Sequence, residues 1–234
     1  MPRPLRRPPA IPTILTLALA AALTAGAPAM AASQQRPYDE VVPSSAVTDD
    51  GLFDVHRVDG RVLFEIPDSV LGRDMIIMSR YHRTQEGLAN VGANMAPNLV
   101  VQWERRGERV YLRAPSHEVT ADPESAMHLA VENGSFAPVV AAFDVEARGE
   151  GTTVIDVTDL YLADTPAFTL PQNQRSRLSV RRYDRDRSWL EWARSFPTNV
   201  EMRVVQSYDA GQPPSSGRGG ALSFEVNHSM VLLP

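Results

Sequence analysis

Three short apolar runs lie between residues 52 and 78, and the dipeptide Asp59-Gly60 separates the first from the second. Asp-Gly between two apolar runs favours a two-residue hairpin turn, because both turn positions need a positive φ. With this turn, Val55 lies opposite Phe64 and Phe53 opposite Ile66. The alternation therefore predicts an antiparallel strand pair with one apolar, buried face.

The second face of this hairpin is mixed in character. The same turn places Asp54 opposite Glu65 and His56 opposite Leu63. Two neighbouring carboxylates are one arrangement that general acid–base chemistry uses. We favour the simpler interpretation, in which this face is exposed and both carboxylates are solvated.

Further apolar runs along the chain predict more strands, because they alternate in polarity or are rich in β-branched and aromatic residues. Gly107 supplies a turn between two of them, and the segment 147–151 joins two others. The strands expected after the first hairpin cover residues 75–78, 98–103, 109–113, 138–146, 152–158, 199–205 and 221–233.

Helices are predicted to be few and short. Asp122 as N-cap, Pro123 as first residue and Asn133-Gly134 as stop signal indicate a helix between them. Further helical turns are expected at 68–71, 159–162 and 188–194, irregular structure at 163–177, and loops at 84–97 and 211–220.

This pattern predicts the fold class. At least eight candidate strands follow one another at hairpin-like spacing, with only two or three short helices between them. We expect a mainly β architecture of antiparallel sheets and hairpins, of sandwich or rolled-sheet type, with a minor α component. Whether the strands form one domain or two subdomains stays open.

Residues 1–31 read as a secretory signal peptide. Arg3, Arg6 and Arg7 form a basic start, an apolar centre spans 11–25, and small residues follow as a cleavage site. We therefore expect export to the periplasm or beyond, with no transmembrane segment. A flexible lead-in at 32–48 and a domain at 49–234 would follow.

Composition narrows the function classes. The chain has 23 basic residues, all arginine, and a net charge of −5, which becomes −8 when residues 1–31 with their three arginines are removed. A net acidic chain without a basic stripe argues against a nucleic-acid partner. The chain has no cysteine, so neither disulfides nor thiolate metal ligands contribute.

Three stretches carry a resemblance to a known family. Residues 49–80 (DDGLFDVHRVDGRVLFEIPDSVLGRDMIIMSR), 186–208 (DRSWLEWARSFPTNVEMRVVQSY) and 226–234 (VNHSMVLLP) resemble the N-terminal region of secreted bacterial zinc-dependent metalloproteases. The resemblance runs from about Tyr38 to Pro234. It implies that zinc is bound by a His-Glu-x-x-His helix and a third histidine in a downstream peptidase domain, which this chain lacks. We therefore expect the chain to be truncated at its C-terminus.

The histidines are the residues to test for a metal site within this chain. His117-Glu118 opens like the protease motif, but residue 121 is alanine, so the second ligand is absent. His128 and Glu132 share a helix face, yet nothing adjacent completes a site. We assign no metal, cofactor or catalytic residue to this segment. The five histidines are His56, His82, His117, His128 and His228.

Other catalytic signatures are absent from the sequence. It contains no Gly-x-Ser-x-Gly nucleophile elbow, and the lack of lysine excludes the phosphate-loop pattern. The segment 184–188 (DRDRS) is instead interpreted as Asp/Arg pairs that fix a turn, with Trp189 and Trp192 packed nearby. A contact between this segment and a downstream catalytic domain is an alternative.

Three functions follow from these observations. The first is a non-catalytic N-terminal portion of an exported zinc-dependent metalloprotease-like protein, which scaffolds or shields its own downstream peptidase domain. The second is a stand-alone secreted β-module that binds a protein, a peptide or a glycan. The third, a self-contained hydrolase that uses carboxylates, has the least support.

Overall fold

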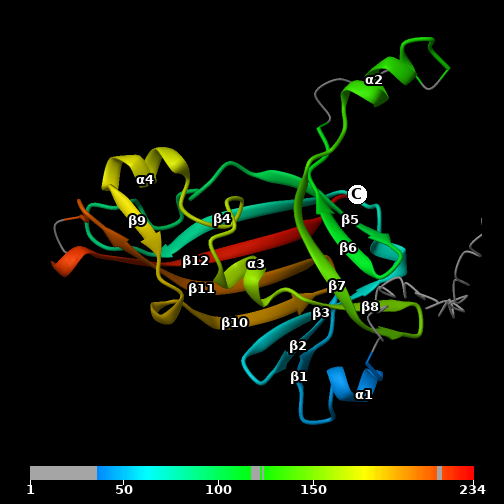
Figure 1. Cartoon of the computed structure of the whole chain (residues 1–234), viewed down its shortest axis with the longest axis horizontal. Helices are drawn as coiled ribbons and strands as arrows, with labels where there is room; N and C mark the ends of the chain where they lie inside the picture. Colours follow the sequence, from blue (N-terminus) through cyan, green and yellow to red (C-terminus); the bar gives the residue numbers. More distant parts are fainter. Residues whose placement is uncertain (1–35, 117–121, 123, 215–217) are drawn as a thin grey trace, which may run out of the picture. The chain divides into compact units, whose positions relative to one another are not determined.

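Twelve antiparallel strands form one continuous sheet in the computed structural model, which describes residues 36–116, 122, 124–214 and 218–234 (Figure 1). The strand order is β1-β2-β3-β8-β7-β6-β5-β4-β12-β11-β10, and β9 pairs with β11 beside β10. The expected mainly β, antiparallel fold class is confirmed. The strands are β1 (Val47–Asp49), β2 (Asp54–Val58), β3 (Arg61–Pro67), β4 (Met75–Arg83), β5 (Leu99–Arg106), β6 (Arg109–Arg113), β7 (Val139–Gly149), β8 (Thr152–Asp156), β9 (Val180–Tyr183), β10 (Trp189–Phe196), β11 (Asn199–Ala210) and β12 (Ala221–Leu232).

The helices of the described residues are short and lie between the strands. None of them has the length and apolar character needed to cross a membrane. The α-helices are α1 (Tyr38–Val41), α2 (His128–Gly134), α3 (Thr158–Leu162) and α4 (Gln172–Leu178), and single 3-10 turns are η1 (Asp68–Val70), η2 (Arg185–Arg187) and η3 (Arg218–Gly220).

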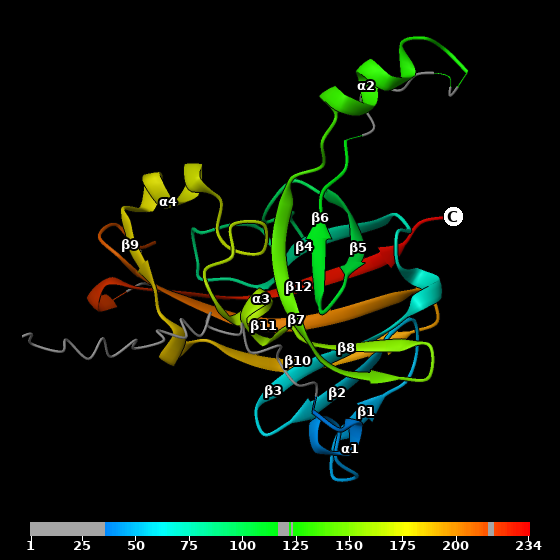
Figure 2. The same ribbon diagram turned by 45° about the vertical axis from the view of Figure 1, so that its right-hand side comes forward.

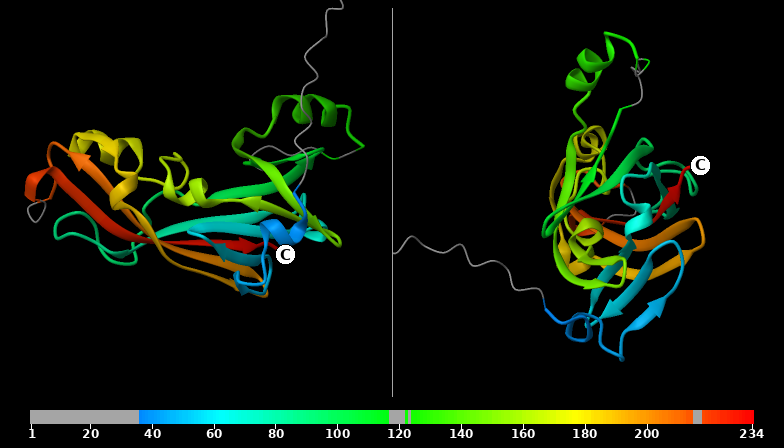
Figure 3. Two further views of the ribbon diagram at one scale, coloured as in Figure 1. Left: turned by 60° about the horizontal axis from the view of Figure 1, so that its bottom comes forward. Right: turned by 90° about the vertical axis from the view of Figure 1, so that its right-hand side faces the viewer.

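The sheet folds back on itself around one main core. This core contains inward side chains from both halves of the strand order, such as Phe64 of β3 and Val226 of β12. Phe53, Phe64 and Trp103 pack with ring centroids 5.4 to 6.4 Å apart. Figure 2 shows β2 and β3 beside β10, and Figure 3 shows the same curvature from two further directions.

The first hairpin has the predicted register. Val55 pairs with Phe64, and Asp54 pairs with Glu65. Asp59 and Gly60 both have positive φ, 49° and 78°, as a type I′ turn requires.

The expectation that the second face of this hairpin is exposed was wrong. Glu65 and His56 are only 7% and 3% exposed, and Leu63 is fully buried. A second, smaller core lies on this face, and helix α1 contributes Val41 to it. The hairpin is therefore buried on both faces, because a segment earlier in the chain covers the mixed one.

The covering segment contains regular secondary structure, whereas a flexible lead-in was expected at 32–48. Val41 of α1 is fully buried, and β1 pairs with β2 from Val47 to Asp49. The polar composition of this segment gave no indication of its one short helix and one short strand. Both are held by tertiary contacts rather than by their own apolar pattern.

Strand β10 covers all but the first residue of the segment 188–194, for which a helix was expected. Its pairing with β11 shifts register between Leu190 and Trp192, which is a β-bulge. A bulge interrupts the two-residue alternation that identifies a strand, so the sequence pattern there is misleading.

Two further elements were not expected. Helix α4 and strand β9 lie in or next to the segment predicted to be irregular. Leu178 is the buried residue of α4, so the sequence of this helix has no amphipathic pattern from which it could be predicted. The predicted helix at 122–133 is also shorter than expected, because α2 begins only at His128.

Candidate functional site

The structure does not gather the histidines into a metal site. His56 and His228 are buried on different strands, the side chain of His82 is 41% exposed, and His128 lies on α2. His117 and the side chain of Glu132 lie outside the described residues. Among the described residues, no group of three or more His, Cys, Asp or Glu side chains is placed to hold a metal ion.

Glu65 is the centre of a buried polar cluster on the second face of the hairpin. Its Oε2 accepts a hydrogen bond from the Tyr38 hydroxyl at 2.6 Å and lies 3.0 Å from His56 Nε2. Its Oε1 accepts a bond from the Thr152 hydroxyl at 2.5 Å. His56 Nδ1 in turn lies 2.8 Å from the Thr48 hydroxyl oxygen.

The electrostatics of this cluster favour a charged Glu65. Burial by itself would raise the pKa of Glu65, but the hydrogen bonds from Thr152, Tyr38 and His56 outweigh burial and lower it. Burial and the contact with Glu65 raise the pKa of Tyr38. Burial is also the main reason why the pKa of Asp54 is raised.

These contacts bear on the acid–base hypothesis. The pKa values of Asp54 and Glu65 move in opposite directions, which is a feature of many catalytic pairs. However, both oxygens of Glu65 already accept hydrogen bonds from the chain. The cluster is thus built to hold α1 and β8 onto the hairpin, and the two carboxylates are not the solvated pair that the sequence suggested.

His228 on β12 is buried in a different environment. Its Nδ1 lies 2.8 Å from the Ser79 hydroxyl oxygen, and its Nε2 has no hydrogen-bond partner among the described residues. The rings of Tyr161 and Phe168 lie 5.5 and 5.6 Å from the imidazole. Burial lowers the pKa of His228 to about 3, so the ring is neutral at pH 7.

The segment 184–188 forms the turn that its Asp/Arg pattern predicts. Asp184 accepts hydrogen bonds from the backbone nitrogen of Arg187 at 3.2 Å and from Arg187 Nε at 2.8 Å. Trp189 follows directly at the start of β10, and its side chain is largely exposed. The turn thus fixes where β10 begins.

An exposed apolar arm is a second notable feature. The described part of the chain has eight exposed large apolar side chains, and four of them lie between residues 127 and 139. This arm is the described segment 124–139, which carries α2 and leads into β7 (Figures 1 and 2). Clustered apolar exposure marks interaction surfaces, whereas single exposed apolar residues need no explanation. The four side chains are Met127, Leu129, Phe136 and Val139.

A third feature is a cleft between β10 and the β2–β3 hairpin. The two elements meet at one end, where Leu52 N donates to Phe196 O at 2.9 Å and Ser195 N to an Asp49 carboxylate oxygen at 3.3 Å. Gly51 permits this contact, because a Cβ there would overlap Ser195 Oγ and stand 2.8 Å from Phe196 N.

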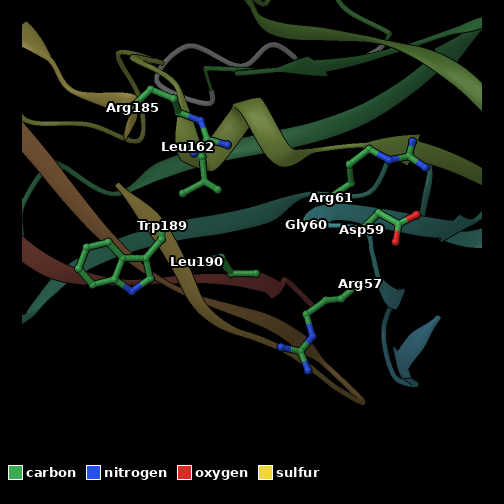
Figure 4. Close-up of a pocket in the computed structure, with 8 residues that line it drawn as sticks. All are labelled: Arg57, Asp59, Gly60, Arg61, Leu162, Arg185, Trp189 and Leu190. Atoms are coloured by element: carbon green, nitrogen blue, oxygen red, sulfur yellow. The ribbon is translucent and has the colours of Figure 1, made fainter. Parts of the chain in front are cut away.

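Towards the hairpin turn the same two elements diverge and leave a cavity of about 410 Å³ (Figure 4). Trp189 and Leu190 of β10 lie on one side of it and the turn residues on the other. Three arginines and one aspartate line it. The full lining is Arg57, Asp59, Gly60, Arg61, Leu162, Arg185, Trp189 and Leu190.

The comparisons with known proteins identify the family. A family model described as "Domain of unknown function (DUF5117)" matches residues 92–234, which is more than half of the chain. The chain belongs to the DUF5117 family. A second model, "Domain of unknown function (DUF5118)", matches residues 35–84. No curated protein and no solved structure matches the chain.

The two matched regions share one sheet. The DUF5118 region contributes β1–β4 and the DUF5117 region contributes β5–β12. Strand β3 pairs with β8, and β4 pairs with both β5 and β12. Residues 35–234 accordingly form one compact unit. The boundary between the two family models thus falls in the loop after β4 and does not divide the core.

Sequence reasoning missed the cleft and the arm as sites. The Asp/Arg segment 184–188 and the Asp59-Gly60 turn both stand out in the sequence, but nothing in the sequence places them side by side. Met127 and Leu129 lie in the predicted helix, Val139 lies in a predicted strand, and Phe136 lies between the two. Their exposure depends on the absence of a covering element among the described residues.

Proposed function

We propose that this DUF5117 chain is the non-catalytic N-terminal portion of an exported zinc-dependent metalloprotease-like protein, where it scaffolds or shields a peptidase domain. The observation that carries the proposal is the apolar arm. Met127, Leu129 and Phe136 are each at least 65% exposed. Exposed apolar side chains gathered on one projecting segment are suited to packing against another domain.

The sequence resemblance supplies the identity of that domain. The matching stretches at 49–80 and 186–208 supply both strands of the first hairpin, all of β10 and most of β11. In this proposal zinc belongs to the peptidase domain, and the residues of this chain contribute no ligand to it. Export depends on residues 1–31 acting as a signal peptide.

The first test is to read the gene beyond the codon for Pro234. We expect the frame to continue into a His-Glu-x-x-His helix with a third histidine. A stop codon at that point would remove the peptidase domain from the proposal.

A second test addresses the arm itself. In the longer protein, Leu129→Ser and Phe136→Ser should expose the interface and increase the cleavage of the domain junction in limited proteolysis. Val91→Ser is the matched control, because Val91 is 69% exposed on the loop after β4, outside the arm. Equal cleavage in all three variants would contradict a docking role for the arm.

A stand-alone secreted β-module that binds a protein, a peptide or a glycan is the alternative. The arginine-lined cleft favours it, because a cavity of about 410 Å³ with several polar groups and an exposed tryptophan is suited to ligand binding. Retention of a partner by the isolated chain would support this alternative.

A further inference from the structure

The cleft beside β10 combines an open sheet edge with unpaired positive charge. We propose that it binds an acidic, extended peptide segment, which adds to the free edge of β10 as a further strand. This inference does not depend on the proposed role beside a peptidase domain, and it specifies the ligand class for the cleft that favours the alternative function.

The open edge is the first argument. Strand β10 ends the strand order and pairs only with β11 along the described chain. Near Phe196 its other edge is closed by the contacts to Leu52 and Asp49. Near Trp189 no described strand pairs with that edge, and the cavity lies there. Free backbone groups on an edge are a template for strand addition.

The charge of the lining is the second argument. Arg61 is offset by Asp156 at 3.7 Å. Arg185 donates to the Ser188 carbonyl oxygen at 3.3 Å, and neither Arg185 nor Arg57 has a carboxylate partner within the described ranges. Asp59 is the acidic residue of the lining. The positive charge therefore exceeds the negative, and arginine is well matched to carboxylates.

The apolar part of the lining indicates which residues accompany the carboxylates of the bound peptide. Trp189 is 51% exposed, and its indole nitrogen donates to the Glu191 carboxylate at 2.8 Å, so Glu191 is already engaged. Leu162 and Leu190 lie on the same cavity. Side chains of an extended peptide alternate between two directions. A segment that alternates acidic and apolar residues presents both kinds to this cleft.

The test uses a blocked peptide as probe. A peptide of about eight alternating Glu and Val residues, acetylated and amidated at its ends, spans a typical strand without terminal charges. We expect saturable one-to-one binding by calorimetry that weakens with salt, and no binding of the Lys/Val analogue. Arg57→Gln and Arg185→Gln should each weaken binding about tenfold, because each removes a charge-assisted hydrogen bond.

Matched controls separate the cleft from general effects. Arg83→Gln removes an equally long, 80% exposed side chain on β4 and should leave binding unchanged. Trp189→Ala should weaken binding, whereas Phe196→Ala, at the closed end of the same strand, should not. Thermal unfolding of each variant establishes that it is folded.

The strand-addition geometry has its own control. The same peptide with a methyl group on every backbone nitrogen keeps its charge but has no N–H to donate to β10, so it should not bind. Equal binding of the methylated peptide, or equal binding by Arg57→Gln, would overturn the proposal. Binding of an acidic polysaccharide in place of the peptide would overturn it as well. None of these results depends on a downstream zinc site, so the two proposals fail separately.

Discussion

Two buried histidines of this protein show how differently the same residue type is accommodated. His56 lies in a polar cluster in which both ring nitrogens have partners, Thr48 on one side and Glu65 on the other. His228 lies among Tyr161 and Phe168 with one partner, Ser79, and a second nitrogen that has none among the described residues. The first ring is held by hydrogen bonds and the second mainly by aromatic packing.

The difference teaches that buried histidines in strands need not form a functional site. Around His56 the chain provides a carboxylate that stays charged, so the cluster connects α1, β1, β2, β3 and β8. Around His228 the surroundings exclude charge and keep the ring neutral. The polar cluster around Glu65 should lose stability when a hydrogen-bonding group is removed. The apolar surroundings of His228 should make stability fall as the pH is lowered. Three experiments test these expectations.

The largest effect is expected from Glu65→Ala. The change leaves the half-buried hydroxyl donors of Tyr38 and Thr152 unsatisfied and removes the partner of the buried His56. We expect a loss of roughly 3–5 kcal/mol in the free energy of unfolding, measured by urea titration. Glu86→Ala, at an exposed glutamate, should change the free energy by less than about 0.5 kcal/mol. A small loss in Glu65→Ala would mean that the cluster does not hold the hairpin.

An intermediate effect is expected from acid acting on His228. Its folded pKa of about 3 lies below the unfolded value, so the unfolded chain binds a proton first. This contribution to stability is complete above about pH 6.5 and is lost as the pH falls towards 3. The slope is at most about 1.4 kcal/mol per pH unit.

The variant His228→Leu should flatten this slope between about pH 6 and pH 4.5, in a series of urea titrations. His82→Leu is the comparison variant, because it removes an imidazole whose side chain is 41% exposed instead of a buried one. Below about pH 4.5 both variants should still lose stability, since the lowered pKa of Glu65 then begins to matter. An unchanged slope in His228→Leu would assign the acid sensitivity to another group.

The smallest effect is expected from Tyr38→Phe. This change deletes one hydroxyl that donates to Glu65 at 2.6 Å and leaves the ring of Tyr38 in contact with the smaller core. We expect a loss of about 1–2 kcal/mol by urea titration. Tyr111→Phe is the control, because its hydroxyl makes no hydrogen bond within the described residues. A loss as large as that of Glu65→Ala would show that α1 detaches as a whole.

The local features of the fold could be predicted from the sequence. The register of the first hairpin, the strand pairs around Gly107 and 147–151, and the mainly β class all follow from alternation and turn residues. Each depends on residues close together in the chain. The expectation that no catalytic zinc is bound by this segment was also made from spacing alone, and it stays a prediction.

Only the tertiary structure decided which faces are covered and which edges are open. Glu65 is buried because α1, from earlier in the chain, packs over it. Strand β10 could not be predicted, because its bulge interrupts the alternation of polar and apolar residues. The arginines of the cleft come from β2, β3 and η2, so their proximity depends on how the sheet folds back. Alternation records which side of a strand is apolar, but it carries no information about what a distant segment brings to the other side.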